Sequence, residues 1–138
     1  MAPDRVWGNK RLKMIVLLDT NALLIPHQHR VDLFSEIERI VTEKHEVATL
    51  STVVDELRGL ASSTTKDDGA AARVGLRLLQ EKKVSIIPSE CPVDDAIVLY
   101  ASQHKAIVCT NDGELKKRLK AACLETLSMR GKNHLERK

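Results

Sequence analysis

Acidic side chains that could share one site stand at four separate places in the sequence: Asp19, Glu56, the adjacent pair Asp94 and Asp95, and Asp112. Carboxylates held a few ångströms apart raise one another's pKa or bind cations. Oxygen ligands of this kind favour hard divalent ions such as Mg²⁺ and Mn²⁺. Two such ions, roughly 3.5–4 Å apart, are a common arrangement for phosphodiester hydrolysis, in which one generates hydroxide and the other stabilises the leaving oxygen. This chemistry needs no nucleophilic side chain, and the sequence offers no convincing one.

Each of these acidic residues also has a purely structural interpretation. Asp19 could cap the turn after a strand, and Asp112 could cap a helix. Glu56 could be a solvated helix residue that pairs with a neighbouring base. Asp94 and Asp95 suit the first turn of a helix because of its dipole, so we expect at least one of them to be only structural. The functional interpretation requires all four places to meet in one crevice.

Short apolar runs predict the strands that would position these residues. Residues 14–18 (MIVLL) form a continuous apolar run, which is typical of a strand buried on both faces. Further strands are predicted at 47–50, 84–87, 106–110 and 125–129. In an open parallel sheet the carboxyl ends of the strands lie along one edge, and ligands bind outside that edge. Asp19 and Asp112 follow the first and fourth runs, so we expect them at this edge.

Helical patterns separate the apolar runs, at residues 31–42, 51–61, 69–82, 93–103 and 113–122. Alternation of strands and helices predicts an α/β fold, a three-layer sandwich with a central parallel sheet of four or five strands and helices on both faces. Residues 62–69 (SSTTKDDG) predict a turn-rich, mobile loop. We expect one domain over residues 1–138, with basic tails at 1–12 and 131–138.

Composition limits the classes of protein that need to be considered. The chain has 138 residues, 43% hydrophobic and 30% charged, which excludes a disordered chain and allows a real core. Aromatic residues make up only 2%, too few for a platform that stacks single-stranded bases. Three cysteines without C-x-x-C spacing predict neither a disulfide framework nor a zinc site. Without a long apolar stretch or a signal peptide, the protein is expected to be cytoplasmic, with no membrane partner.

The net charge of +3 conceals an uneven distribution. Basic residues dominate segments 1–13 and 116–138, whereas acidic residues dominate the middle of the chain. This pattern favours a polyanion held at the edges and cations held in the centre, although solvated tails around an acidic surface would look the same. Phosphate-binding candidates follow the last acidic residue, and a solvated helix face is the alternative for them: Lys116, Lys117, Arg118, Lys120, Arg130 and Lys132.

Four short motifs resemble the PIN-domain ribonucleases over about residues 14–130. They are LLDTN (17–21), VVDEL (53–57), VDDAIVLYA (93–101) and IVCTNDGELKKRL (107–119). Each is weak alone, but their order along a strand–helix alternation is specific. The resemblance implies a PIN-like sandwich and a metal-dependent endoribonuclease that uses Mg²⁺ or Mn²⁺, with two ions expected.

The resemblance also assigns roles to individual residues. The metal-binding and catalytic set would be Asp19, Glu56, one of Asp94 and Asp95, and Asp112, whose position is sometimes replaced in the family. Asp95 is favoured over Asp94 because it precedes Ala-Ile, as the corresponding family aspartate precedes small and apolar residues. Asn21 and Thr110 resemble the family's polar residues that orient carboxylates or substrate by hydrogen bonds.

Two branches of the family compete. The segment after Asp112 and residues 23–40 (LLIPHQHRVDLFSEIERI) look more like archaeal and eukaryotic PIN proteins of ribosomal-RNA processing than like VapC-type toxins. The leading hypothesis is therefore an rRNA- or RNA-processing ribonuclease that acts on RNA such as pre-rRNA. The alternatives are a VapC-type toxin ribonuclease and a non-catalytic module for RNA binding or ribosome assembly. Small PIN domains often pair, so a homodimer is a further expectation.

Two other catalytic classes fit the sequence poorly. Aspartate-nucleophile phosphatases place D-x-D after a first strand, whereas this chain has Asp19-Thr20-Asn21, which disfavours a phosphoaspartate mechanism. No G-x-G-x-x-G follows any predicted strand, which disfavours a dinucleotide-binding fold.

Overall fold

The fold is a six-stranded sheet with helices on both faces, as seen in a computed structural model that describes residues 13–62 and 66–138. The strand order is β3-β2-β1-β4-β5-β6, and every neighbouring pair is parallel except the antiparallel pair β5 and β6. The strands are β1 (Met14–Leu18), β2 (His45–Leu50), β3 (Ser85–Ile87), β4 (Ala106–Cys109), β5 (Thr126–Arg130) and β6 (His134–Arg137). The predicted α/β class is confirmed, with six strands in place of four or five.

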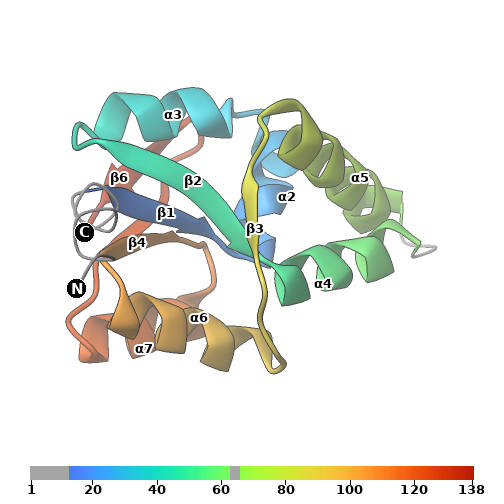
Figure 1. Ribbon diagram of the computed structural model, residues 1–138. Coiled ribbons are helices and arrows are strands. Elements are labelled where there is room, and N and C mark those ends of the chain that lie inside the picture. Colours follow the sequence, from blue (N-terminus) through green and yellow to red (C-terminus); the bar gives the residue numbers. More distant parts are fainter. Residues whose placement is uncertain (1–12, 63–65) are drawn as a thin grey trace.

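The described residues form six helices: α2 (Thr20–His29), α3 (Leu33–Ile40), α4 (Ser51–Ala61), α5 (Lys66–Glu81), α6 (Val93–Gln103) and α7 (Gly113–Ala121). In Figure 1, α3 lies over one face of the sheet, and α6 and α7 lie side by side under the other. Helices α2, α4 and α5 pack together beyond the end of the sheet toward which β1 and β2 run. No helix of the described residues is long and apolar enough to cross a membrane.

Strand β1 occupies the centre of the sheet and fixes where the site must lie. Its buried residues Val16, Leu17 and Leu18 are fully inaccessible, as expected for a strand covered on both faces. Leu18 is in register with Thr49 of β2 and with Cys109 of β4. The carboxyl ends of these three strands are therefore level, and the residues that follow them share one edge.

Helix α2 was not predicted from the sequence patterns. Its residues 22–25 are all buried, so the segment lacks the alternation of apolar and polar faces that marks a surface helix. Pro26 inside the helix also argues against helix from sequence alone. The close approach of α5 explains the burial: a Cβ on Gly75 would lie 2.6 Å from the carbonyl oxygen of Leu23. Helix α5 begins at Lys66, so the end of the predicted 62–69 loop is helical.

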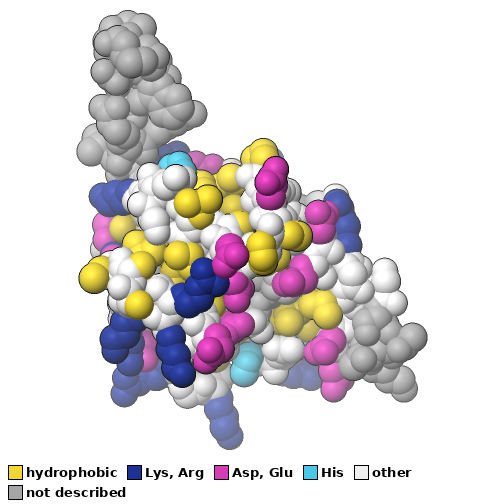
Figure 2. Space-filling view, turned by 90° about the horizontal axis from the view of Figure 1, so that it is seen from below, with side chains coloured by type: hydrophobic (Ala, Val, Ile, Leu, Met, Phe, Trp, Pro, Cys, Tyr) yellow, Lys and Arg dark blue, Asp and Glu magenta, His cyan; other side chains and the backbone are white. Residues whose placement is uncertain are grey.

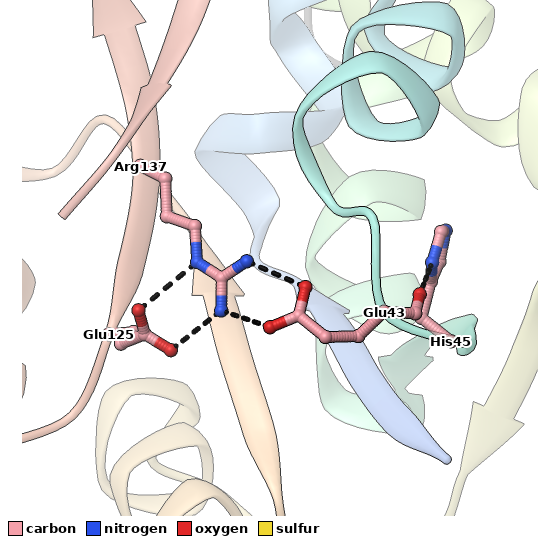
Figure 3. Close-up of polar contacts among 4 residues, drawn as sticks. All are labelled: Glu43, His45, Glu125 and Arg137. Atoms are coloured by element: carbon pink, nitrogen blue, oxygen red, sulfur yellow. Dashed lines mark hydrogen bonds and ion pairs between the residues drawn. The ribbon is translucent and has the colours of Figure 1, made fainter.

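The predicted C-terminal tail is the second difference between sequence patterns and fold. Residues 131–138 form a turn and the strand β6, with Leu135 buried. Figure 3 shows how the end of this strand is held: Arg137 donates two hydrogen bonds of 2.7 Å to Glu43 and two more to Glu125. Charged residues such as these make the segment look like a solvated tail in sequence. The predicted N-terminal tail, residues 1–12, lies outside the described residues.

Candidate active site

Asp19 stands at the centre of the candidate site, directly after β1. Its backbone N–H donates to Cys109 O over 3.2 Å, which ties it to the end of β4. The side chain is only 3% exposed. Oδ1 accepts a hydrogen bond of 2.7 Å from Ala22 N, and Oδ2 accepts one from the hydroxyl of Thr110. Asp19 is thus the N-cap of α2, as the structural interpretation expected, and is at the same time a buried acid at the sheet edge.

Burial raises the pKa of Asp19 from 3.8 to about 7, because the charged form loses its solvation. The hydrogen bonds from Thr110 and Ala22 partly oppose this shift, whereas the charges of Asp112 and Asp94 add to it. Near neutral pH the carboxyl group is therefore close to half-ionised. A cation bound beside it would favour the ionised form.

Glu56 reaches the site from α4. Its side chain is exposed, and Oε1 accepts a hydrogen bond from the hydroxyl of Thr20, the residue after Asp19. Thr20 was not assigned a role from sequence, although its place directly after Asp19 was a signal for one. The start of α4 is held in turn by Thr52, whose hydroxyl lies 2.8 Å from that of Ser89 in the segment leading to α6.

The pair at the start of α6 separates into two different environments. Asp94 is half-buried, and its pKa is raised by burial, by Asp112, and to a lesser degree by Glu56 and Asp95, with Arg118 opposing the shift. Asp95 is exposed, and its Oδ1 lies 2.9 Å from Nη2 of Arg118. The charges of Asp112 and Glu56 thus act on Asp94, whereas Asp95 contacts a base. The preference for Asp95 over Asp94, drawn from the Ala-Ile sequence, stays a prediction.

Asp112 approaches the site from the start of α7. It is the N-cap of this helix, and its Oδ1 accepts hydrogen bonds from Glu114 N (2.9 Å) and Leu115 N (3.2 Å). Its backbone N–H donates to the hydroxyl oxygen of Thr110 over 3.0 Å. Thr110 thus bridges Asp112 and Asp19, the kind of orienting role that the resemblance implied. Asn21, the other implied orienting residue, lies half-buried in the first turn of α2.

Asp19, Glu56, Asp94 and Asp112, hereafter the acidic group, influence one another electrostatically. Asp94 and Asp112 raise the pKa of Asp19, and Asp112 and Glu56 raise that of Asp94. Within residues 13–62 and 66–138, no three His, Cys, Asp or Glu side chains are already arranged as a metal centre. The donors are nevertheless all oxygens, and their mutual repulsion is the property that a hard divalent cation would relieve. The ligand type and the negative charge of the acidic group therefore fit Mg²⁺ or Mn²⁺.

The predicted phosphate-binding residues divide between two elements. Lys116, Lys117, Arg118 and Lys120 lie on α7, whereas Arg130 ends β5 and Lys132 follows in the turn before β6. Several are paired with acids: Lys117 with Glu114 over 3.4 Å, Arg118 with Asp95, and Arg130 with Glu136 over 3.0 Å. Figure 2, seen from the side of α6 and α7, shows Lys and Arg gathered mainly at lower left and acids at centre and right.

Comparison with known proteins identifies the family of the chain. The sequence matches the PIN like domain family over residues 16–132. It is 31% identical over 123 residues to Ribonuclease VapC4 of Methanocaldococcus jannaschii, covering 88% of this chain and 94% of that protein. It is 28% identical over 120 residues to Ribonuclease VapC9 of Archaeoglobus fulgidus, covering 87% and 84%.

The fold also matches a solved structure. The PIN domain endonuclease Utp24 superimposes with a TM-score of 0.75 at 26% sequence identity, with 90% of each chain covered. The resemblance drawn from the four motifs is confirmed, and the chain belongs to the PIN-like domain family.

Proposed function

We propose that this protein is a metal-dependent endoribonuclease that hydrolyses RNA phosphodiesters at the acidic group. The observation that carries the proposal is Asp19: a carboxylic acid buried at the carboxyl edge of the sheet, with other acids from three further helices acting on it or on its neighbour Asp94. Acids around a carboxylate that only caps a helix would be unfavourable, because like charges disfavour its ionised form. The ribonuclease names of the two relatives support the same conclusion.

Each residue of the site has a role in this proposal. Asp19, Glu56, Asp94 and Asp112 would hold one or two Mg²⁺ or Mn²⁺ ions. The bound ions would supply an activated water and a positive charge at the leaving oxygen. Thr110 orients Asp19 by its hydrogen bond, and Thr20 does the same for Glu56. Water attack on phosphorus with departure of the 3′ oxygen would leave a 5′-phosphate and a 3′-hydroxyl.

Among the family's branches, we favour a VapC-type ribonuclease over the rRNA-processing type. Both curated relatives carry the VapC name, and the match spans nearly the whole of the M. jannaschii protein. The rRNA-processing type stays the second candidate on the sequence motifs, and the similarity to the PIN domain endonuclease Utp24 supports an endonuclease in either case.

The test is a cleavage assay on RNA, including pre-rRNA fragments, in the presence of Mg²⁺ or Mn²⁺. We expect 5′-phosphate products with the wild type, and none in EDTA or with Asp19→Asn. Asp32→Asn is the matched control, because Asp32 also caps a helix, α3, through its side chain but lies outside the acidic group. Cleavage that survives both EDTA and Asp19→Asn would refute the proposal.

The two branches are separated by a second assay. A VapC-type toxin should arrest growth when its expression is induced, and Asp19→Asn should abolish the arrest. An rRNA-processing enzyme should leave growth unaffected and cut pre-rRNA at a defined position. If the wild type cleaves no RNA under any of these conditions, the non-catalytic RNA-binding module becomes the better interpretation.

A further inference from the structure

Arg118 and Asp95 form an ion pair at the rim of the acidic group. Nη2 of Arg118, on α7, lies 2.9 Å from Oδ1 of Asp95, on α6. The side chains are 46% and 61% exposed, respectively. An ion pair with this exposure contributes little to stability, because water screens it and two long side chains must be ordered to form it. It can therefore be exchanged for another partner at small cost.

Arg118 differs from the other paired basic residues near the site in the position of its acidic partner. Lys117 pairs with Glu114 on its own helix, and Arg130 pairs with Glu136 on the neighbouring strand β6. The partner of Arg118 instead follows Asp94 directly in the chain. The charge of Arg118 also reaches Asp94, whose pKa it lowers against the effect of the surrounding acids.

A ribonuclease with this charge distribution must solve an electrostatic problem. The acidic group repels the phosphates of RNA, so cations at its rim are needed to hold the strand on either side of the bond that is cut. The guanidinium group is suited to this task, because its planar donors match carboxylate and phosphate oxygens equally well. In the free protein the guanidinium group of Arg118 contacts the carboxylate of Asp95.

We propose that Arg118 binds an RNA phosphate beside the acidic group, and that Asp95 is a positioning residue that holds Arg118 until RNA replaces it. This inference rests on the proposed function and makes it more specific. It assigns Asp95 to substrate binding through Arg118, and leaves Asp94 as the acid of α6 that belongs to the acidic group. The adjacent aspartates thus have opposite expected effects when they are neutralised.

The first test measures binding without cleavage, with a short fluorescein-labelled single-stranded RNA in EDTA and fluorescence anisotropy as the readout. Arg118→Ala should weaken binding by about tenfold, the effect of losing one hydrogen-bonded contact to a charged group. The slope of log K against log salt should fall by about 0.7, as expected for one phosphate contact on a single strand. Arg118→Lys should restore part of the affinity, since lysine binds phosphate without the planar fork.

Arg39→Ala is the matched control. Arg39 forms a similar pair, with Nη2 2.8 Å from Oε1 of Glu36 and 56% of its side chain exposed, but it lies on α3 over the opposite face of the sheet. This variant should bind RNA as the wild type does. If Arg39→Ala weakens binding as much as Arg118→Ala, or if Arg118→Ala binds like the wild type, the proposal is wrong.

The second test compares Asp95→Asn with Asp94→Asn. Asp95→Asn should tighten RNA binding by about two- to fivefold, because the competing charge for Arg118 is gone. Asp94→Asn should abolish cleavage. Loss of cleavage in Asp95→Asn without tighter binding would overturn the proposal and return Asp95 to the metal-binding set. A wild type that binds RNA through Arg118 but never cleaves it would refute the proposed function and leave the exchange intact.

Discussion

Replacing Asp19 by Asn should stabilise the metal-free protein at high pH while it abolishes activity. The wild-type carboxyl group keeps its proton up to about pH 7 in the folded state, against 3.8 for the ordinary group. Between these values the folded state binds more protons than the unfolded chain does. The free energy of unfolding of the wild type therefore falls as the pH rises through this window, and Asn removes that dependence.

The size of the effect follows from the pKa shift and the hydrogen bonds of Asp19. At about 1.4 kcal/mol per unit, ionised Asp19 costs the fold up to about 4 kcal/mol above pH 7. Asn can still accept the bond from Ala22, but its amide nitrogen cannot accept the one from the Thr110 hydroxyl, a loss of about 1–2 kcal/mol. We expect a net gain of about 2–3 kcal/mol at pH 8.

The assay is unfolding in urea or by heat, in EDTA, at pH 5 and at pH 8. The stability of Asp19→Asn relative to the wild type should rise by about 3 kcal/mol between the two pH values, the part of the linkage that falls in this range. The corresponding change in melting temperature is about 10 °C for a domain of this size. Asp32→Asn, whose wild-type carboxyl group has a lowered pKa, should show no such gain.

An equal stability difference at pH 5 and pH 8 would refute the reasoning, because it would mean that Asp19 ionises in the folded state as it does in water. A gain at pH 8 that disappears when Mg²⁺ is added would support both the raised pKa and the proposed metal site. In that case the metal stabilises only the wild type, by mass action on the folded state.

Three further predictions follow from other contacts. Thr110→Val removes the hydrogen bond that lowers the pKa of Asp19. The acidic limb of the plot of kcat/KM against pH should therefore shift by about one unit to higher pH. A purely steric effect would not produce this shift. Gly75→Ala places a methyl group 2.6 Å from Leu23 O and should destabilise the fold by about 1–3 kcal/mol in urea unfolding, whereas Gly59→Ala, with open space around it, should stabilise it by about 0.5–1 kcal/mol. Arg137→Ala should lower the melting temperature, and its stability should fall less between pH 5 and pH 2 than that of the wild type. The reason is that Arg137 holds the pKa of Glu43 at about 2, a stabilisation that is present above pH 4.5 and lost as the pH falls toward 2. An equal fall in stability in both proteins would contradict this.

The sequence predicted the elements whose patterns are local. Strand β1 was predicted with its observed bounds, because a continuous apolar run of that length has few alternatives. Helix α2 was not predicted, since its burial on all sides depends on α5, which is distant in the chain. Strand β6 was not predicted either, because its charged side chains are held by Glu43 and Glu125, contacts that no local pattern reveals.

The choice between Asp94 and Asp95 shows the same limit within the site. Adjacent residues of a helix point about 100° apart, so only one of them can face a given neighbour. Which one does so is decided by how α6 packs against α7 and where Arg118 lies, and not by the residues that follow in the sequence. The residues that follow in the sequence favoured Asp95, whereas its contact with Arg118 led us to propose Asp94 for the acidic group.

The structural interpretation of the acids as helix caps is compatible with the functional interpretation that we propose. Asp19 caps α2 and Asp112 caps α7, while Asp94 lies in the first turn of α6. Helix N-termini carry partial positive charge, which favours anions nearby. The helices that follow parallel strands all begin at the carboxyl edge, so the fold itself provides positive ends where the acids gather. Capping hydrogen bonds therefore favour the ionised acids in the free protein: the bond from Ala22 N lowers the pKa of Asp19, against the larger effect of burial. A divalent cation at this edge would neutralise the negative charge that the helix N-termini neutralise only in part.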